Sequence, residues 1–314
     1  MTKYLLGRLG QSAVVLVIVS LVIFGLVHLL PGSPAKAELG IKATPQAIAA
    51  FNRLNGFDKP LWVQYWVYVD HLFHGNLGFS YDENAPVTQL FMARFPKSML
   101  LVGLSLVVAV VLAIPLGVYQ AVRRNGVGDY MLTGASFGLY SFPTFWLGFV
   151  LIALLSVSLH LFPPTAPSGN SVFAILADWR GLVLPVMTLA LVSVAAFSRY
   201  MRSSMIDALA QDYIRTARAK GLSERAVLMV HALRNSLIPM ATMIGLSLPS
   251  ILGGALVTEQ VYNYPGVGLL FFDAAGRSDF PVLLGLTLVG AVGVVIGNLV
   301  ADIAYVTLDP RIRY

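Results

Sequence analysis

SRYMRSSMIDALAQDYIRTARAKGLSERAVLMVHALRNSLIP, residues 198–239, separates two strongly apolar segments in the second half of the chain. Its seven basic side chains are too costly to bury in lipid: Arg199, Arg202, Arg215, Arg218, Lys220, Arg225 and Arg234. A connection between neighbouring helices needs only a few residues, whereas this one is long and has helical periodicity. The stretch therefore indicates a function beyond joining two membrane spans.

The composition around this stretch is that of an integral membrane protein. Of 314 residues, 57% are hydrophobic and 11% are charged, and the mean hydropathy is +0.76, values far from those of soluble proteins. Six apolar runs are long enough to cross a hydrocarbon layer of about 30 Å as helices. They are approximately Leu9–Leu30, Met99–Gln120, a run from near Asp129, Leu182–Phe197, Leu237–Thr258 and Pro281–Tyr305. We expect an all-α integral membrane protein with six transmembrane helices.

Two further properties of the composition limit the chemistry. Cysteine is absent, which excludes disulfides, thiolate metal sites and cysteine nucleophiles but leaves the redox compartment open. The first thirty residues also resemble a signal peptide, but the apolar run is too long and ends in Pro31-Gly32-Ser33-Pro34 instead of a small-x-small cleavage site. We therefore predict an uncleaved first span.

The distribution of basic residues predicts the orientation in the membrane. The net charge of +6 does not favour nucleic acid as a partner, because basic residues beside spans ordinarily fix topology. Most lysines and arginines fall on the side that holds both termini and residues 198–239, so this side is predicted to be cytoplasmic. The expected organisation is an N-terminus and first span (1–30), an extracytoplasmic helical insertion (31–98), a five-span core (99–305) that includes the cytoplasmic loop 198–239, and a cytoplasmic tail (306–314).

The extracytoplasmic segment is predicted to contain two helices. Thr44 and Pro45 favour a helix start and Asn55-Gly56 a helix end. A second helix runs from Pro60 to Gly75 and carries an aromatic face at positions i, i+4, i+7 and i+11, which we expect at the membrane interface or packed on the spans: Trp62, Trp66, Val69 and Phe73. His71 and His74 with Asp70 lack a further ligand, so a metal site is not favoured.

Motifs within the spans argue against catalysis by this chain. Gly134-Ala-Ser136-Phe-Gly138 fits the serine-hydrolase pattern, but that chemistry needs a strand-turn-helix elbow, and here the motif lies in a helical span. Close helix packing at glycines four apart is the better interpretation, as for Gly293 and Gly297. No G-x-x-x-x-G-K-[ST] loop is present, so we expect no ATP hydrolysis by the chain itself.

Prolines and polar residues within the spans mark a candidate pathway. Pro143, Pro185 and Pro249 permit bends in the third to fifth spans. Glu259, at the outer end of the fifth span, is interpreted either as part of a pathway or gate or as a plain interfacial carboxylate. Asn298 and Asp302 share one helix face near the cytoplasmic end, where helix packing and function both remain open.

The long connection itself is predicted to be two helices joined at a glycine. Gly221 ends the first helix and Ser223 caps the second. An apolar stripe (Ile206, Leu209, Tyr213, Ala217) lies opposite a polar face (Asp207, Gln211, Arg215, Arg218). A solvated loop with topology-fixing charges is one interpretation. The stripe and the glycine turn are unnecessary for topology and favour a docking element for a cytoplasmic partner.

At these residues the chain resembles a known family. Asp212-Tyr-Ile-Arg-Thr-Ala-Arg-Ala-Lys-Gly-Leu-Ser223, followed by His231-Ala-Leu-Arg-Asn-Ser-Leu-Ile-Pro239, is similar to the cytoplasmic loop of permease subunits of binding-protein-dependent ABC importers, dipeptide/oligopeptide/nickel branch. Arg215-Thr216-Ala217 stands where the general family pattern has Glu-Ala-Ala before the glycine. Weaker matches follow in order along the chain: His28-Leu-Leu-Pro-Gly32, Gly75-Asn-Leu-Gly78, Glu259 with Pro265-Gly-Val-Gly268, and Leu308-Asp-Pro-Arg311.

The resemblance implies a type I importer permease fold that supplies half of a translocation pathway in a bacterial inner membrane. Its implied partners are a second permease subunit, two cytoplasmic ATPases that bind ATP and Mg, and an extracytoplasmic substrate-binding protein; the chain itself holds no cofactor. The ATPase-coupling residues would be Asp212, Arg215, Thr216, Ala217, Arg218, Lys220 and Gly221. Peptides are the expected solute, with nickel chelates, glutathione or haem as alternatives. An autonomous secondary transporter or channel is the competing class, although the sequence lacks obvious inverted repeats.

Overall fold

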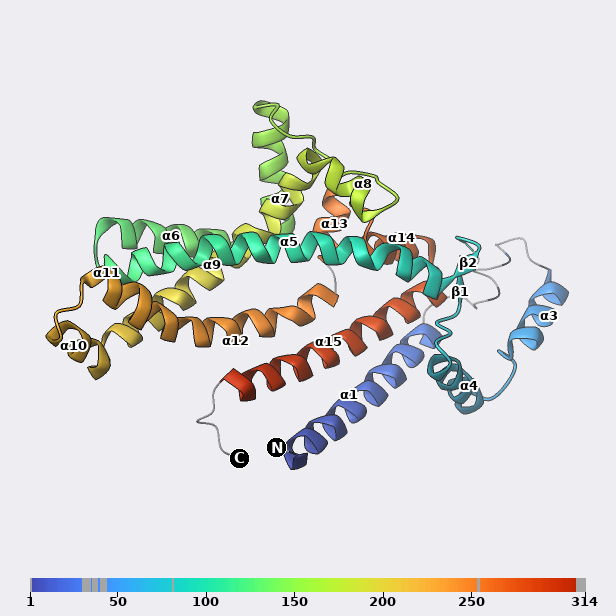
Figure 1. Ribbon diagram of the computed structural model, residues 1–314. Helices are drawn as coiled ribbons and strands as arrows, with labels where there is room; N and C mark the ends of the chain where they lie inside the picture. Colours follow the sequence, from blue (N-terminus) through green and yellow to red (C-terminus); the bar gives the residue numbers. More distant parts are fainter. Residues whose placement is uncertain are drawn as a thin grey trace.

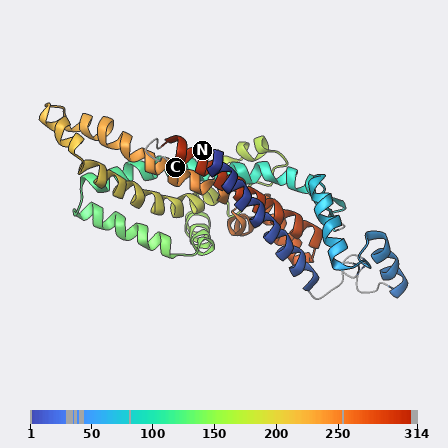
Figure 2. The same cartoon turned by 90° about the horizontal axis from the view of Figure 1, so that it is seen from below.

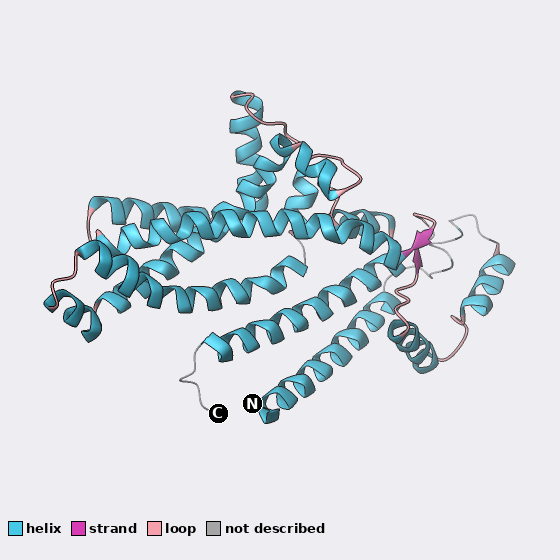
Figure 3. Cartoon of the chain, in the orientation of Figure 1, coloured by secondary structure: helices cyan, strands magenta, loops and turns pink. Residues whose placement is uncertain are grey.

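The computed structural model describes residues 2–29, 35, 39, 44–80, 82–252 and 255–308, and this part of the chain is almost entirely helical (Figures 1 and 3). Two short antiparallel strands pair Phe79 with Pro86 and Ser80 with Ala85. Most long helices lie along one direction in Figure 1, and α7 and α8 project from one side. The expected all-α fold is therefore confirmed.

The elements follow one another in this order: α1 (Thr2–Leu29), α3 (Pro45–Asn55), α4 (Leu61–Phe73), β1 (Phe79–Ser80), β2 (Ala85–Pro86), α5 (Val87–Val122), α6 (Val127–Ser141), α7 (Thr144–Leu151), the π-helix η1 (Ile152–Ser158), α8 (Val172–Ala177), α9 (Trp179–Leu209), α10 (Asp212–Ala219), α11 (Glu224–Ala226), the π-helix η2 (Val227–Ala232), α12 (Leu233–Leu252), α13 (Leu256–Tyr262), α14 (Val267–Arg277) and α15 (Phe280–Leu308).

Length and composition identify four helices that can cross a membrane: Val87–Val122, Trp179–Leu209, Glu224–Gly245 and Phe280–Leu299. The pair Val127–Ser141 and Thr144–Ser158 makes a fifth if it is counted as one broken span. Gly10–Leu26 of α1 is apolar but shorter. The described residues thus support four to five spans by these measures, one or two fewer than the six expected.

The boundaries of the spans differ from the sequence-based ones. α5 begins at Val87, well before Met99, and α9 continues through Ser198 to Leu209. No glycine or proline interrupts α9 after Pro185. The helix therefore continues through the basic residues Arg199 and Arg202. The polar connection is correspondingly shorter than the whole of 198–239. It consists mainly of α10 and the turns beside it, because the candidate span Glu224–Gly245 already contains α11 and η2.

Pro143 breaks the third span instead of kinking it. α6 ends at Ser141, α7 starts at Thr144, and the two helices meet at 107°. Phe142 is extended (φ −82°, ψ 136°), because a residue before proline is pushed out of the helical region. The predicted bend is therefore confirmed, but the prediction of one kinked helix was wrong. Pro185, by contrast, lies within the unbroken α9.

The expected fifth span, Leu237–Thr258, is not one helix. α12 ends at Leu252 and α13 begins at Leu256, and Ala255 between them is not helical (φ −85°, ψ 56°). Gly253 and Gly254 lie outside the described residues, as do residues 30–34 and 309–314 of the predicted turn and tail. Pro249 falls within α12.

The core consists of three apolar clusters. All three include residues of α5, and two of them include residues of α9. The first joins α5, α9, α10, η2 and α12, the second joins α5, α7, α9 and α13, and the third joins α5, α14 and α15. α5 and α9 approach closely at Gly117, where an added Cβ would lie 2.6 Å from the Met201 Cβ. The first cluster thus ties α10 and η2 to the long helices.

The glycine pair in α6 does not mediate close packing. An added Cβ at Gly134 or Gly138 would meet nothing within 4 Å, so this interpretation was wrong for α6 within the described chain. Ser136 between them is buried in a helix, not on a strand-turn-helix elbow. In α15 Gly293 and Gly297 are buried and Asn298 is exposed, and the side chain of Asp302 lies outside the described part of the chain.

Candidate functional site

The candidate docking helix is α10, which lies at one extreme of the molecule beyond the end of α9 (Figure 1). Ile214 and Ala217 are 0% and 4% exposed and join the apolar cluster of α9 and η2. Gly221 adopts φ +77°, which glycine allows without steric penalty, and Ser223 Oγ accepts a hydrogen bond from the Ala226 amide at 3.3 Å. The predicted glycine break and serine cap are confirmed, and α10 is fixed to the membrane helices along its inner face.

The apolar face of this helix is not the predicted one. Tyr213 is 38% exposed, whereas its neighbour Ile214 is buried. α9 ends at Leu209, and Gln211 is extended (φ −75°, ψ 151°), so the periodicity restarts at α10. A single stripe running from Ile206 to Ala217 therefore crosses a helix boundary. Asp212, an acidic residue suited to the first turn of a helix, is the sequence signal that marks this new start.

The outer face of α10 is polar and exposed. Arg215 lies 3.5 Å from the Asp212 carboxylate, and both side chains are more than three-quarters exposed. Arg218 donates two hydrogen bonds to Glu224, at 2.8 and 3.2 Å, which raises the pKa of Arg218. Of the seven predicted coupling residues, Ala217 is buried in the core and the other six are exposed. The exposed residues are Asp212, Arg215, Thr216, Arg218, Lys220 and Gly221.

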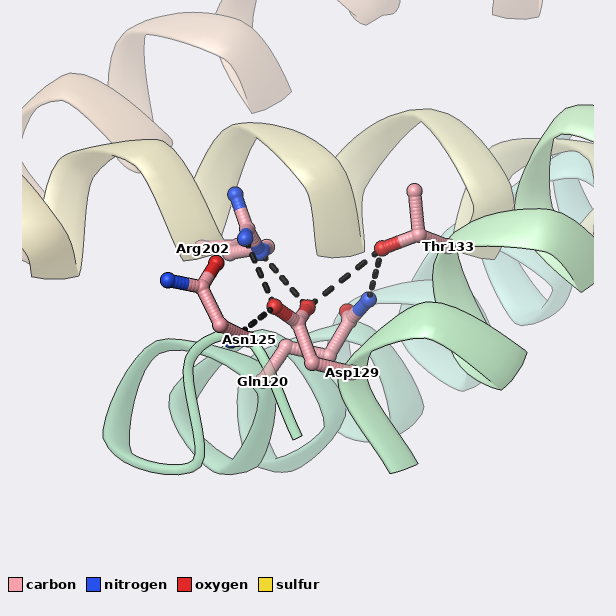
Figure 4. A network of polar contacts seen from close by, with 5 residues as sticks. All are labelled: Gln120, Asn125, Asp129, Thr133 and Arg202. Carbon is pink, nitrogen blue, oxygen red and sulfur yellow. Dashed lines mark hydrogen bonds and ion pairs between the residues drawn. The ribbon is translucent and has the colours of Figure 1, made fainter. Parts of the chain in front are cut away.

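An ion pair that sequence reasoning missed joins α9 to α6 (Figure 4). Arg202 Nε and Nη2 donate to the two Asp129 oxygens, each at 2.7 Å, and the Asp129 side chain is only 2% exposed. The Asn125 amide donates to Asp129 Oδ2 at 3.0 Å, and the Thr133 hydroxyl lies 3.4 Å from Oδ1. This bidentate geometry is specific to arginine. It fixes the start of α6 to the part of α9 that precedes α10.

A pocket of about 330 Å³ opens where the two helix breaks meet α9. Thr144 and Phe145 begin α7 just after Pro143, and residues 255–258 begin α13 just after the end of α12. The full lining is Thr144, Phe145, Leu189, Ala255, Leu256, Val257 and Thr258. It contains two hydroxyls and no charged side chain. The structure therefore brings the Pro143 break and the neighbourhood of Glu259 together, and their role in a pathway stays a prediction.

Glu259 itself faces away from this pocket. Its side chain is completely buried. Oε1 accepts from Ser98 Oγ at 2.6 Å, and Oε2 accepts from the amides of Gly268 and Leu269 at 2.6 and 3.2 Å. A carboxylate at the start of a helix is favourable because it satisfies free amides, so Glu259 caps α14. A plain interfacial carboxylate does not fit this burial, and a gate role stays a prediction.

The glycines near Glu259 are explained by this cap. A Cβ at Gly266 would lie 2.3 Å from Glu259 Oε2, and one at Gly268 would lie 2.6 Å from the Leu256 Cα. Only glycine allows α13 and α14 to approach so closely. Gly78 adopts φ +100°, a conformation that favours glycine, and an added Cβ there would lie 3.4 Å from the Pro281 Cβ at the start of α15. Both glycine motifs thus have a structural cause.

Two buried tyrosines fix α13 beside the pocket. The Tyr262 hydroxyl lies 2.8 Å from Thr188 Oγ1 and donates to the Gly148 carbonyl at 3.2 Å. The Tyr264 hydroxyl donates to the Lys97 carbonyl at 2.6 Å. These bonds hold α13 against α5, α7 and α9, so one wall of the pocket is well anchored.

Comparison with known proteins identifies the family of this chain. The family model described as binding-protein-dependent transport system inner membrane component matches residues 113–314, and the model of its N-terminal part matches residues 1–102. The chain belongs to this family. The resemblance seen in the sequence is thereby confirmed, and the protein is a membrane component of a transport system.

Three relatives are similar to this permease over their full length. The oligopeptide transport system permease protein AppB of Bacillus subtilis (strain 168) is 40% identical over 316 residues, covering all of both chains. The glutathione transport system permease protein GsiC of Salmonella typhimurium is 38% identical over 315 residues, again covering both chains. The dipeptide transport system permease protein DppB of Escherichia coli (strain K12) is 36% identical over 337 residues, covering all of this chain and 99% of the relative.

Proposed function

We propose that this chain is one of two permease subunits of an ABC importer and forms half of its pathway for peptides across the bacterial inner membrane. The observation that carries the proposal is α10: its apolar face is anchored to α9 and η2, and its charged face is free. A helix built in this way is suited to dock on another protein. The proposed partners are two cytoplasmic ATPases, which bind ATP and Mg, and an extracytoplasmic binding protein.

The contacts of α10 suggest how movement passes to the pathway. When ATP binding closes the ATPase pair, α10 is displaced and carries the end of α9 with it through Ile214 and Ala217. Arg202 on α9 holds Asp129, so the start of α6 follows. α6 leads to the break at Pro143 and from there to the pocket at Thr144. The docking helix and the pocket are thereby joined by one contiguous set of packed elements.

The pocket lining is consistent with peptides as solute. None of the seven lining residues is charged, so the lining favours neither sign of side-chain charge. Thr258 is only 2% exposed, so the half-buried Thr144 offers the hydroxyl that can bind a peptide group. Oligopeptide and dipeptide permeases and a permease for glutathione, itself a tripeptide, are among the relatives. Nickel chelates and haem are not named by these three relatives, and we therefore favour peptides.

We further propose six spans, with both termini in the cytoplasm. α1 supplies the first span, α6 with α7 and η1 the third, and α12 with α13 the fifth. α1 packs along α15, and the start of α1 and the end of α15 lie on the same side of the molecule (Figures 1 and 2). The basic residues on that side support a cytoplasmic location. Residues 31–98 then lie on the extracytoplasmic side.

Charge reversal on α10 tests the docking role. We expect Arg215→Glu with Lys220→Glu to abolish copurification of the ATPases, because both side chains are exposed on the free face and the substitutions leave the core contacts of α10 intact. Arg225→Glu is the matched control: Arg225 is exposed in the neighbouring α11 and should leave copurification unchanged. Full ATPase recovery with the doubly reversed variant would remove the docking role from α10.

A further inference from the structure

Within the part of the chain that the structure describes, one face of α4 is exposed and aromatic, and its one ring contact is between Trp66 and the neighbouring Tyr65. Trp62, Trp66 and Phe73 are 69%, 63% and 85% exposed. Their spacing of i, i+4 and i+11 places them on a single stripe. The sequence left two explanations for this stripe, namely packing on the spans or contact with the membrane interface.

A different face of α4 packs on α1. The Tyr65 hydroxyl lies 2.9 Å from Ser20 Oγ, and the Tyr65 and Tyr68 rings lie 5.5 and 6.0 Å from the Phe24 ring. Burial raises the pKa of Tyr68 to about 12, so this ring stays neutral against α1. The span-facing position is therefore taken by tyrosines, and the tryptophan stripe does not pack on the spans.

The side opposite the stripe is polar. Gln64 and His71 are seven residues apart, about half a turn of the helix away from Trp62, Trp66 and Phe73. Gln64 Nε2 donates to the carbonyls of Phe57 and Lys59, at 3.2 and 2.7 Å, and so closes the turn between α3 and α4. The helix thus has an aromatic face, a polar face and, between them, the tyrosines that hold it to α1.

The orientation of α4 suits a helix lying in a membrane surface. Figure 1 shows α4 nearly end-on beside α1, which is seen lengthwise, and Figure 2 shows α4 lengthwise at the same end of α1. α4 therefore crosses α1 steeply. Apolar side chains of α1 are also exposed, and their burial in lipid would be favourable. They include Val14, Ile18, Leu21, Val22 and Leu26.

We propose that α4 lies flat in the extracytoplasmic surface of the inner membrane, with Trp62, Trp66 and Phe73 inserted at the boundary between headgroups and acyl chains. Tryptophan is enriched at this depth because its ring is apolar and its indole N–H is polar. An amphipathic helix binds there through its apolar face. The partner of the stripe is the lipid surface, and the tyrosine contacts fix α4 to the first membrane helix.

Tryptophan fluorescence tests this placement. Trp146→Phe with Trp179→Phe leaves Trp62 and Trp66 as the only tryptophans, and this full-length variant is reconstituted in phosphatidylcholine vesicles. Bromines attached near the headgroups should remove most of the emission, bromines near the chain ends should remove less, and acrylamide should have little effect. Full quenching by acrylamide with none by either lipid would overturn the proposal. Protection from acrylamide only after addition of a binding protein would also overturn it and would assign the stripe to protein docking.

Spin labels provide a second measurement with a matched control, because the chain has no native cysteine. Phe73→Cys and His71→Cys place a label on the aromatic and the polar face of the same turn. The label at position 73 should collide more with oxygen, which dissolves in lipid, and the label at position 71 more with a water-soluble nickel chelate. Equal accessibility of both labels to the chelate would contradict the membrane placement.

Discussion

At the scale of single residues, the ion pair between Asp129 and Arg202 is expected to affect both stability and coupling. Asp129→Asn keeps an oxygen for the Asn125 amide but removes the charge that holds Arg202. A hydrogen bond to a charged group contributes about 1.5–3 kcal/mol, and we expect a loss of this size in the free energy of unfolding, measured by denaturation in detergent. ATP hydrolysis by the reconstituted importer should also become partly independent of transport, because α6 no longer follows α9.

The exposed pair between Arg277 and Asp82 provides the control for this variant. Arg277 Nη1 donates to Asp82 at 2.6 Å, but both side chains are about half exposed. Surface ion pairs contribute about 0–1 kcal/mol, so Arg277→Lys should change little. Equal stability losses for Asp129→Asn and Arg277→Lys, with unchanged coupling in both, would show that the buried pair has no special role.

The close approach between α13 and α14 yields a prediction at a single glycine. A Cβ at Gly268 would lie 2.6 Å from the Leu256 backbone and 2.8 Å from Glu259 Oε2. Forcing extra atoms into a packed site costs about 1–3 kcal/mol, so Gly268→Ala should lower the thermal midpoint. Gly276→Ala, on the same helix with open space around it, should be neutral or stabilising. A neutral Gly268→Ala would refute the cap geometry.

At the scale of elements, the break at Pro143 shapes the pocket. Pro143→Ala restores a backbone donor and relieves the restriction on Phe142, so α6 and α7 should straighten from their angle of 107°. Spin labels at Tyr130→Cys on α6 and Phe149→Cys on α7 should then move apart. Ser141→Ala, two residues before the proline, is the control and should leave the distance unchanged. An unchanged distance in the proline variant would show that packing, not Pro143, sets the bend.

The elements also show what sequence patterns resolve. Caps and glycine turns were predicted correctly at Thr44, Gly56, Gly221 and Ser223, because each depends on a few neighbouring residues. The end of α9 at Leu209 was missed, because no glycine or proline marks it. The burial of Ile214 in place of Tyr213 follows from that missed boundary.

The candidate site was predictable only in part, because its tertiary contacts join distant residues. Glu259 and Pro265-Gly-Val-Gly268 could be grouped as a motif, but the partner hydroxyl of Ser98 is 161 positions away. Asp129 and Arg202 are 73 positions apart. Patterns along a single helix cannot reveal such pairs. The pocket likewise depends on two breaks, after α6 and after α12, that meet only in the folded chain.

At the scale of the whole molecule, the three apolar clusters form one continuous support. The first holds the docking helix, the second surrounds the pocket, and the third holds α14 and the start of α15. α5 contributes to all three clusters. In the proposed movement, α5 would therefore keep its position while α9 and α6 move relative to it. This arrangement suits the membrane component of a transport system.

The central claim is that this permease moves peptides only as part of an ATP-driven assembly. The most direct measurement is uptake of a labelled dipeptide by proteoliposomes that contain either the complete importer or this chain alone. We predict uptake by the complete importer that depends on ATP and on the binding protein, and none by the chain alone. Dipeptide flux through the chain alone, without ATP, would contradict the account and identify an autonomous transporter.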